Sequence, residues 1–325
     1  MVLRRAATLT GSAGPERCRS PPQRAVEDSP ARHLQSSAIE SDWGMPLSAS
    51  GTYSPLPPVK ILWINPIGLS AYDRPMADVL AQIKQPATTL ELVSLRMDTS
   101  PDNLEYRTFE ALIVRETVEL TRYAAVSGFD GVVIGCFYDP ALLDAREISG
   151  NAVVVAPCEA SVQVATRLCN RFSVIVGQSF WTEQMTARVR EYGLEHKLAS
   201  MRSIDCPVCE MQVDPAKTRQ KILDAARQAL NEDGAEAIIL GCTMEFGLFR
   251  ELQEVLDVPV IDPVFAAFKE CEFAAGMKAA YGWKPSRAGS CRAPSERDLE
   301  RFHIFERPPP IGNRVLVPIQ SQPDQ

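Results

Sequence analysis

Residues 234–245, with the sequence GAEAIILGCTME, have an earlier counterpart in residues 128–139, GFDGVVIGCFYD. Each segment begins with Gly, passes through a run of aliphatic residues and reaches Gly-Cys, which polar or aromatic residues follow. A short aliphatic run bounded by turn residues predicts a strand buried on both faces, as in a parallel sheet. Cys136 and Cys242 therefore follow two equivalent strands, at the sheet edge where open α/β folds bind ligands.

The spacing of these segments indicates an internal repeat. Cys136 and Cys242 are 106 positions apart, and so are Val153 and Pro259 in the next predicted strands. The first strands of the two halves, at Val59 and Ser173, are 114 positions apart. We predict an α/β fold of two pseudo-symmetric lobes, each a mostly parallel four-stranded sheet flanked by helices, with the active site in the cleft between them. The predicted division is an N-terminal tail (1–57), lobe 1 (58–157 with 264–283), lobe 2 (158–263) and a Pro-rich C-terminal tail (284–325).

Hydrophobic periodicity places the elements of this repeat along the chain. Besides the two cysteine strands, we expect strands at 59–66, 90–95, 151–157, 172–177, 198–204 and 258–263, the second of them more exposed than the others. The predicted helices are 74–84, 109–127, 141–147, 159–171, 183–192, 217–231, 248–256 and 264–281. The polar connector 98–106 is a candidate cover for the site.

Composition limits the classes of partner. The net charge of -7 and the pI of about 5.2 argue against a broad phosphate-binding surface and hence against nucleic acid. No apolar run reaches the ~20 residues that span a bilayer. We therefore expect a small-molecule substrate and no membrane, with a homo-oligomer left open.

The nine cysteines are predicted to be reduced thiols of a cytoplasmic protein, because residues 1–51 lack the apolar core of a secretion signal. Arginines and serines in this stretch faintly suggest a transit peptide, but its acidic residues and prolines favour a disordered tail. With only three histidines, most zinc enzymes and most Ser-His or Cys-His nucleophile systems are excluded.

Two opposed cysteines suit the inversion of a carbon stereocentre, because one base removes the proton and the other delivers one on the opposite face. The pKa of a free thiol, near ~8.5, falls when backbone N–H groups or a helix N-terminus stabilise the thiolate. The alternative is that Cys136 and Cys242 are small buried hydrophobes, which is common for free cysteine. Their matched positions, each after Gly, favour the catalytic interpretation.

Four segments carry a resemblance to a known family: Asn65-Pro66, the Gly-Cys-Phe-x-Asp-Pro stretch at 135–140, 240–243, and 260–263. Over roughly Val59 to Tyr281 the chain resembles the aspartate/glutamate/hydantoin racemase superfamily, and its first cysteine motif resembles the hydantoin and allantoin racemase branch. The resemblance implies a cofactor-independent, two-base mechanism with Cys136 and Cys242 as the opposing acid and base. The favoured substrate is a hydantoin- or allantoin-like cyclic ureide.

The resemblance also implies substrate-binding positions, and several of them depart from the family pattern. Asn65-Pro66 is followed by Ile67-Gly68-Leu69 instead of Asn and a hydroxyl residue, with Ser70 as the displaced hydroxyl. Cys242 is followed by Thr243-Met244-Glu245 where the branch has Ala-Gly-Met. The remaining predicted substrate contacts are Phe137, Tyr138, Glu159, Gln178 and Ser179. Two of these residues could instead have a structural role. Asn65 could be a turn residue, and Glu159 could be a charge favoured at a helix N-terminus.

Other features carry weaker functional predictions. Cys206 and Cys209 form a C-x-x-C pair, but without a second pair at zinc spacing no metal site is predicted. Asp139-Pro140 and Asp262-Pro263 are interpreted as turns that stop strands. Trp63 and Trp181 either line the cleft or fill the core.

Three alternative functions remain open at this point. A decarboxylase of disubstituted malonates is less favoured, because relatives of that kind lack the first cysteine. A maleate-type cis–trans isomerase uses two cysteines but adds one of them to the alkene. A non-catalytic ligand-binding protein on the same scaffold is the alternative from a different class.

Overall fold

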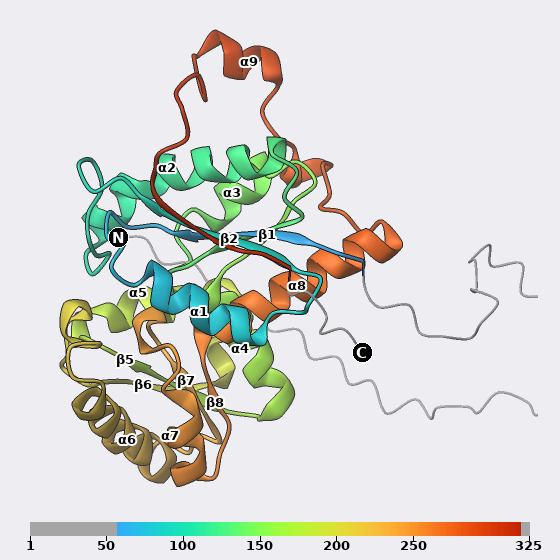
Figure 1. The fold of residues 1–325 in the computed structure, drawn as a ribbon. Helices are drawn as coiled ribbons and strands as arrows, with labels where there is room; N and C mark the ends of the chain where they lie inside the picture. Colours follow the sequence, from blue (N-terminus) through green and yellow to red (C-terminus); the bar gives the residue numbers. More distant parts are fainter. Residues whose placement is uncertain (1–56, 320–325) are drawn as a thin grey trace, which may run out of the picture. The chain divides into compact units, whose positions relative to one another are not determined.

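The computed structural model describes residues 57–319, which form two β-sheets covered by helices (Figure 1). The strands are β1 (Lys60–Asn65), β2 (Thr89–Leu95), β3 (Gly131–Ile134), β4 (Val153–Val155), β5 (Phe172–Val176), β6 (Leu198–Ser203), β7 (Ala237–Leu240), β8 (Val260–Ile261) and β9 (Ile311–Val317). The α-helices are α1 (Asp73–Ile83), α2 (Arg107–Val126), α3 (Leu142–Ile148), α4 (Pro157–Leu168), α5 (Thr182–Glu191), α6 (Pro215–Glu232), α7 (Phe249–Leu256), α8 (Pro263–Tyr281) and α9 (Glu296–Arg301).

The two sheets repeat one strand order. The first is ordered β4-β3-β1-β2-β9, and the second, taken from its far edge, is β8-β7-β5-β6. Every pair except β2 with β9 is parallel. The strands that precede Cys136 and Cys242, β3 and β7, therefore lie next to the first strand of their half in both sheets. This arrangement confirms the predicted α/β fold with parallel sheets flanked by helices.

Two long helices connect the sheets. α4 follows β4 of the first sheet but packs on β7 and β8 of the second, whereas α8 follows β8 and packs on β3 and β4. α4 and α8 also pack on each other, and both lie between the two sheets in Figure 1. This crossing brings the carboxyl ends of β3 and β7 to a common region of the molecule.

The C-terminal part of the chain differs from the prediction. The sequence predicts a tail over residues 284–325, but β9 within this range pairs antiparallel with β2 and makes the first sheet five-stranded. The expectation that residues 90–95 are more exposed is wrong for the same reason. β9 pairs along the edge of β2, and all six residues are buried. The predicted N-terminal tail lies outside the described residues, apart from Pro57.

Across residues 57–319, none of the helices combines the length and apolar character needed to cross a membrane.

Candidate active site

The glycine before each cysteine lies where β3 or β7 comes very close to the central strand of its sheet. Gly135 N–H donates to the Ile64 carbonyl at 2.7 Å, and Gly241 N–H donates to the Ile175 carbonyl at the same distance. A Cβ on Gly135 would lie 2.4 Å from Trp63 Nε1, and one on Gly241 would lie 2.5 Å from the Ile175 oxygen. Only glycine fits at these positions, so Gly-Cys holds each thiol at the end of its strand.

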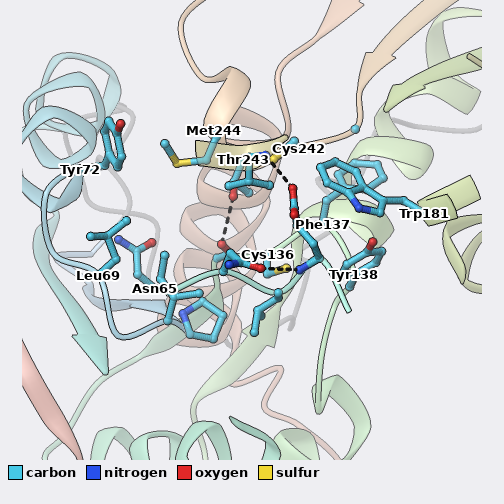
Figure 2. Close-up of a pocket in the computed structure, with 18 of the residues that line it drawn as sticks. Asn65, Leu69, Tyr72, Cys136, Phe137, Tyr138, Trp181, Cys242, Thr243 and Met244 are labelled. Atoms are coloured by element: carbon cyan, nitrogen blue, oxygen red, sulfur yellow. Dashed lines mark hydrogen bonds between the residues drawn. The ribbon is translucent and has the colours of Figure 1, made fainter. Parts of the chain in front are cut away.

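Cys136 and Cys242 line one pocket at the carboxyl ends of β3 and β7 (Figure 2). Their loops are linked directly, because Thr243 Oγ1 donates to the Gly135 carbonyl at 3.3 Å. The pocket is lined by Asn65, Pro66, Ile67, Leu69, Tyr72, Met76, Asn103, Leu104, Glu105, Gly135, Cys136, Phe137, Tyr138, Trp181, Met185, Val208, Gly241, Cys242, Thr243 and Met244. Most of these side chains are apolar, so the few polar groups among them decide what the pocket can orient.

The structure gathers most of the predicted site residues in this pocket. These are Asn65, Pro66, Cys136, Phe137, Tyr138, Cys242, Thr243 and Met244. Ser70, Glu159, Gln178 and Ser179 do not line it. The carboxylate of Glu159 instead pairs with Arg146, which also donates to the Val154 carbonyl. Glu159 therefore joins α4 to α3. This agrees with its alternative, structural role as a charge at a helix N-terminus.

Sequence reasoning missed several lining residues, among them the polar Tyr72, Asn103 and Glu105. Trp181, which the sequence places either in the cleft or in the core, lines the pocket, and its ring packs so closely over Gly177 that a Cβ there would lie 2.5 Å from it. Trp63, the other tryptophan of that pair, is fully buried and donates Nε1–H to Asn65 Oδ1 at 2.9 Å. Glu105 belongs to the 98–106 connector, and the prediction that this connector covers the site is the signal that could have found it. The connector does cover the pocket, as Asn103, Leu104 and Glu105 show.

Two buried donors in the pocket have no partner within the described residues. They are the hydroxyl of Tyr138 and the Nε1–H of Trp181, whose rings meet edge to face with centroids 6.4 Å apart. Burying a polar group without a hydrogen bond costs free energy, so such groups in a pocket indicate a ligand acceptor. The Glu105 carboxylate is instead a hydrogen-bond acceptor. It accepts the Val208 N–H at 2.7 Å and has further lone pairs for a ligand donor.

Burial governs the ionisation of both thiols. It raises the pKa of Cys136 to about 12, partly offset by the Tyr138 N–H that donates to the sulfur. Burial likewise raises the pKa of Cys242 well above its usual value, and the nearby Glu245 carboxyl adds to this rise while the Met244 N–H opposes it. The expected lowering by a helix N-terminus is not dominant, because α3 begins only at Leu142 and Cys242 precedes a single 3-10 turn.

Two aspartates tie the cysteine loops to long helices. Asp139 accepts the N–H groups of Cys158 and Glu159, both at 2.8 Å, at the start of α4. Asp262 accepts the Val264 N–H at 2.9 Å at the start of α8 and the Gly247 N–H at 2.7 Å after the second cysteine. These Asp-Pro pairs thus do more than stop strands, because each fixes a segment next to one of the cysteines to a helix N-terminus.

The C-x-x-C pair stays apart from this chemistry. Cys206 is buried and Cys209 is exposed, and both are free thiols outside the pocket lining. Val208, which lies between the two cysteines in sequence and donates its N–H to Glu105, does line the pocket.

Comparisons with known proteins agree with this geometry. A family model described as Asp/Glu/Hydantoin racemase matches residues 61–271. The chain is 38% identical to a hydantoin racemase of Rhizobium meliloti over 173 residues, which are 53% of this chain and 71% of that protein. It is 31% identical over 240 residues to a hydantoin racemase of Paenarthrobacter aurescens, covering 74% of this chain and 99% of that protein. The solved structure of an allantoin racemase from Klebsiella pneumoniae superposes with a TM-score of 0.68 at 31% identity, covering 73% of this chain and 94% of that one.

Proposed function

The chain belongs to the Asp/Glu/hydantoin racemase family and is an isomerase of the racemase type, and from this premise we propose that it inverts the carbon next to a carbonyl in a five-membered cyclic ureide, without a cofactor. One observation carries the proposal: two cysteines at equivalent strand ends of a repeated fold line the same pocket. A hydantoin or allantoin type of substrate is in keeping with the names of the relatives described above.

The chemistry requires one thiolate and one thiol. The thiolate takes the proton from one face of the C5 carbon, and the electron pair moves onto the C4 carbonyl oxygen as an enolate. The opposite thiol then delivers its proton to the other face, so the two sulfurs exchange protonation states in each turnover. Because both directions use the same pair, Cys136 serves as base for one enantiomer and Cys242 for the other.

The polar groups of the pocket complement a cyclic ureide ring. Such a ring carries two carbonyl acceptors and two N–H donors. The Tyr138 hydroxyl and Trp181 Nε1–H are free to bind a carbonyl oxygen, where enolate charge develops, and the Glu105 carboxylate is placed to accept a ring N–H. The apolar wall of Leu69, Met76 and other residues suits a substituent at C5.

The test follows solvent deuterium into each enantiomer of 5-benzylhydantoin and of allantoin with the variants Cys136→Ser and Cys242→Ser. We expect each variant to lose racemisation by at least about 100-fold, because general acid–base groups contribute about 10²–10⁴-fold. Each variant should still exchange one enantiomer without inverting it, and the two variants should prefer opposite enantiomers.

Cys209→Ser is the matched control, since Cys209 is an exposed free thiol outside the pocket. It should racemise both enantiomers at the wild-type rate. Wild-type rates in both pocket variants would contradict the two-cysteine mechanism. Release of carbon dioxide from a disubstituted malonate, without racemisation of any ureide, would contradict the assigned reaction.

We also place this activity in the cytoplasm, which the eight free thiols among the described residues support.

A further inference from the structure

A buried carboxylate beside the pocket is held by three side chains from three different elements. Asp73, at the start of α1, is 1% exposed. It accepts Asn65 Nδ2–H at 2.6 Å, the Ser94 hydroxyl at 2.8 Å and Asn313 Nδ2–H at 2.8 Å. None of these three contacts is with a cation, so the hydrogen bonds alone stabilise the buried carboxylate. Loss of one donor would leave part of the carboxylate charge without a partner.

This carboxylate fixes the orientation of a pocket residue. The oxygen of the Asn65 amide accepts Trp63 Nε1–H at 2.9 Å, and its nitrogen donates to Asp73. With both ends committed, the amide cannot flip, and one N–H of Asn65 remains for another acceptor. Asn65 lines the pocket and is labelled in Figure 2 beside Leu69. Asp73 therefore decides which group Asn65 presents to a ligand.

The third donor comes from a part of the chain that lies beyond the family match. β9 follows residue 271, where that match ends, and pairs with β2 so that Asn313 lies opposite Ser94. A Cβ on Gly312 would lie 2.1 Å from the Leu95 oxygen, so glycine permits the close approach that brings Asn313 to Asp73. Along β9 the residues alternate between half-buried and exposed, and Asn313 is on the half-buried side.

We infer that β9 is a working part of the active site and that Asn313 is a positioning residue, which acts through Asp73 to hold Asn65 in the orientation that binds substrate. The inference rests on the proposed function in so far as Asn65 contacts the substrate. It adds a requirement for the C-terminal strand, which the family's matched region does not contain.

The test compares Asn313→Ala with Arg314→Ala. Arg314 lies on the other face of β9 and pairs with Glu91, so its loss weakens the strand without touching Asp73. We expect Asn313→Ala to lower kcat/KM for hydantoin racemisation about tenfold, because misplaced binding groups are costly. Arg314→Ala should lower the Tm and leave kcat/KM within about twofold, since its charge pair lies away from the pocket. Crystal structures of both variants should show Asn65 displaced only in the first.

A charge exchange provides the second arm. Asn313→Asp places two carboxylates together and should impair activity at least as much as Asn313→Ala. The double variant Asn313→Asp/Asp73→Asn again pairs one donor with one acceptor, so it should recover most of the activity. Equal kinetic effects of Asn313→Ala and Arg314→Ala, with Asn65 unmoved, would overturn the inference. If the wild type racemises no ureide, the proposed function fails instead, and the position of Asn65 in the Asn313→Ala crystal still decides whether β9 orients it.

Discussion

At the scale of single residues, the two thiols are held mainly in their neutral form. Burial raises the pKa of both, and the backbone donors next to them offset only part of that rise. The free enzyme therefore carries little thiolate at neutral pH, and the fraction grows as the pH rises toward the thiol pKa.

This predicts a rise of kcat/KM with pH. Below the thiol pKa the thiolate fraction grows about tenfold per pH unit, so kcat/KM should increase steeply between about pH 6 and pH 8. Initial rates of racemisation, with a ureide methylated at N3 so that the ring itself does not ionise, would measure it. A flat profile across this range would mean that the thiolate is already formed in the free enzyme.

Tyr138 has an unpartnered hydroxyl although it is only 4% exposed. Tyr138→Phe removes that group without changing the ring, so the ligand-free protein should keep its Tm or gain in Tm. The same variant should lower kcat/KM by about 10–100-fold, because a hydrogen bond to developing enolate charge contributes about 1–3 kcal/mol. Thermal unfolding and racemisation rates together test this, and a fall in both would instead indicate a structural partner for the hydroxyl.

At the scale of elements, each cysteine loop is attached to the helix that crosses between the sheets. Asp139 connects the first loop to α4, and Tyr192 also donates its hydroxyl to this carboxylate at 2.6 Å. Burial raises the pKa of Asp139 to about 7 in spite of these donors. Because its pKa is raised in the folded state, this group contributes stability at low pH that is lost as the pH rises toward the folded pKa.

The consequence is measurable with Asp139→Asn. The wild-type Tm should fall between about pH 4 and pH 7, and the fall should be smaller in the variant, which has no proton to lose there. The variant should have a lower Tm at pH 7 or below, since an amide cannot accept all three donors. Scanning calorimetry across this range would show it, and equal slopes for both proteins would contradict the raised pKa.

At the scale of the whole molecule, side chains join the two sheet-bearing halves beside the pocket. Arg188 on α5 donates to the Tyr138 carbonyl at 2.8 Å and to Glu110 on α2 at 3.0 Å. Tyr106 of the connector stacks on Phe180 with ring centroids 5.5 Å apart. These contacts hold the halves in one arrangement, and the proposed mechanism needs such an arrangement to keep the two thiols on opposite faces of the substrate.

Arg188→Ala should therefore reduce both stability and activity. It removes donors from a carbonyl and a largely buried carboxylate, at a cost of about 1–3 kcal/mol in the free energy of unfolding, and loosens the loop that bears Cys136. Arg190→Ala on the same helix breaks only the exposed pair with Glu195, which solvent screens, so the urea midpoint should stay close to that of the wild type. Urea unfolding and kcat measured on both variants would separate the two, and similar values would show that the cross-connection is unimportant.

The sequence by itself determined the repeated architecture and the position of both cysteines. Short aliphatic runs bounded by turn residues and followed by Gly-Cys predict strands buried on both faces, and equal spacing along the chain then predicts equal places in two sheets. Residues 135–140 and 240–243 carried this information locally, because the glycine and the strand end belong to the same short segment. The lining by Asn65, Phe137, Tyr138 and Thr243 follows from the same sheet edge.

Only the tertiary structure decided which other residues meet the thiols. Glu105 and Trp181 reach the pocket because separate elements fold over it, and Glu159 turns away because Arg146 lies within reach. The place of β9 also depended on a distant partner, since a single strand flanked by prolines has no stability until an open sheet edge is available to it. Side-chain pairing and edge pairing join residues far apart in sequence, so local patterns hold no record of them.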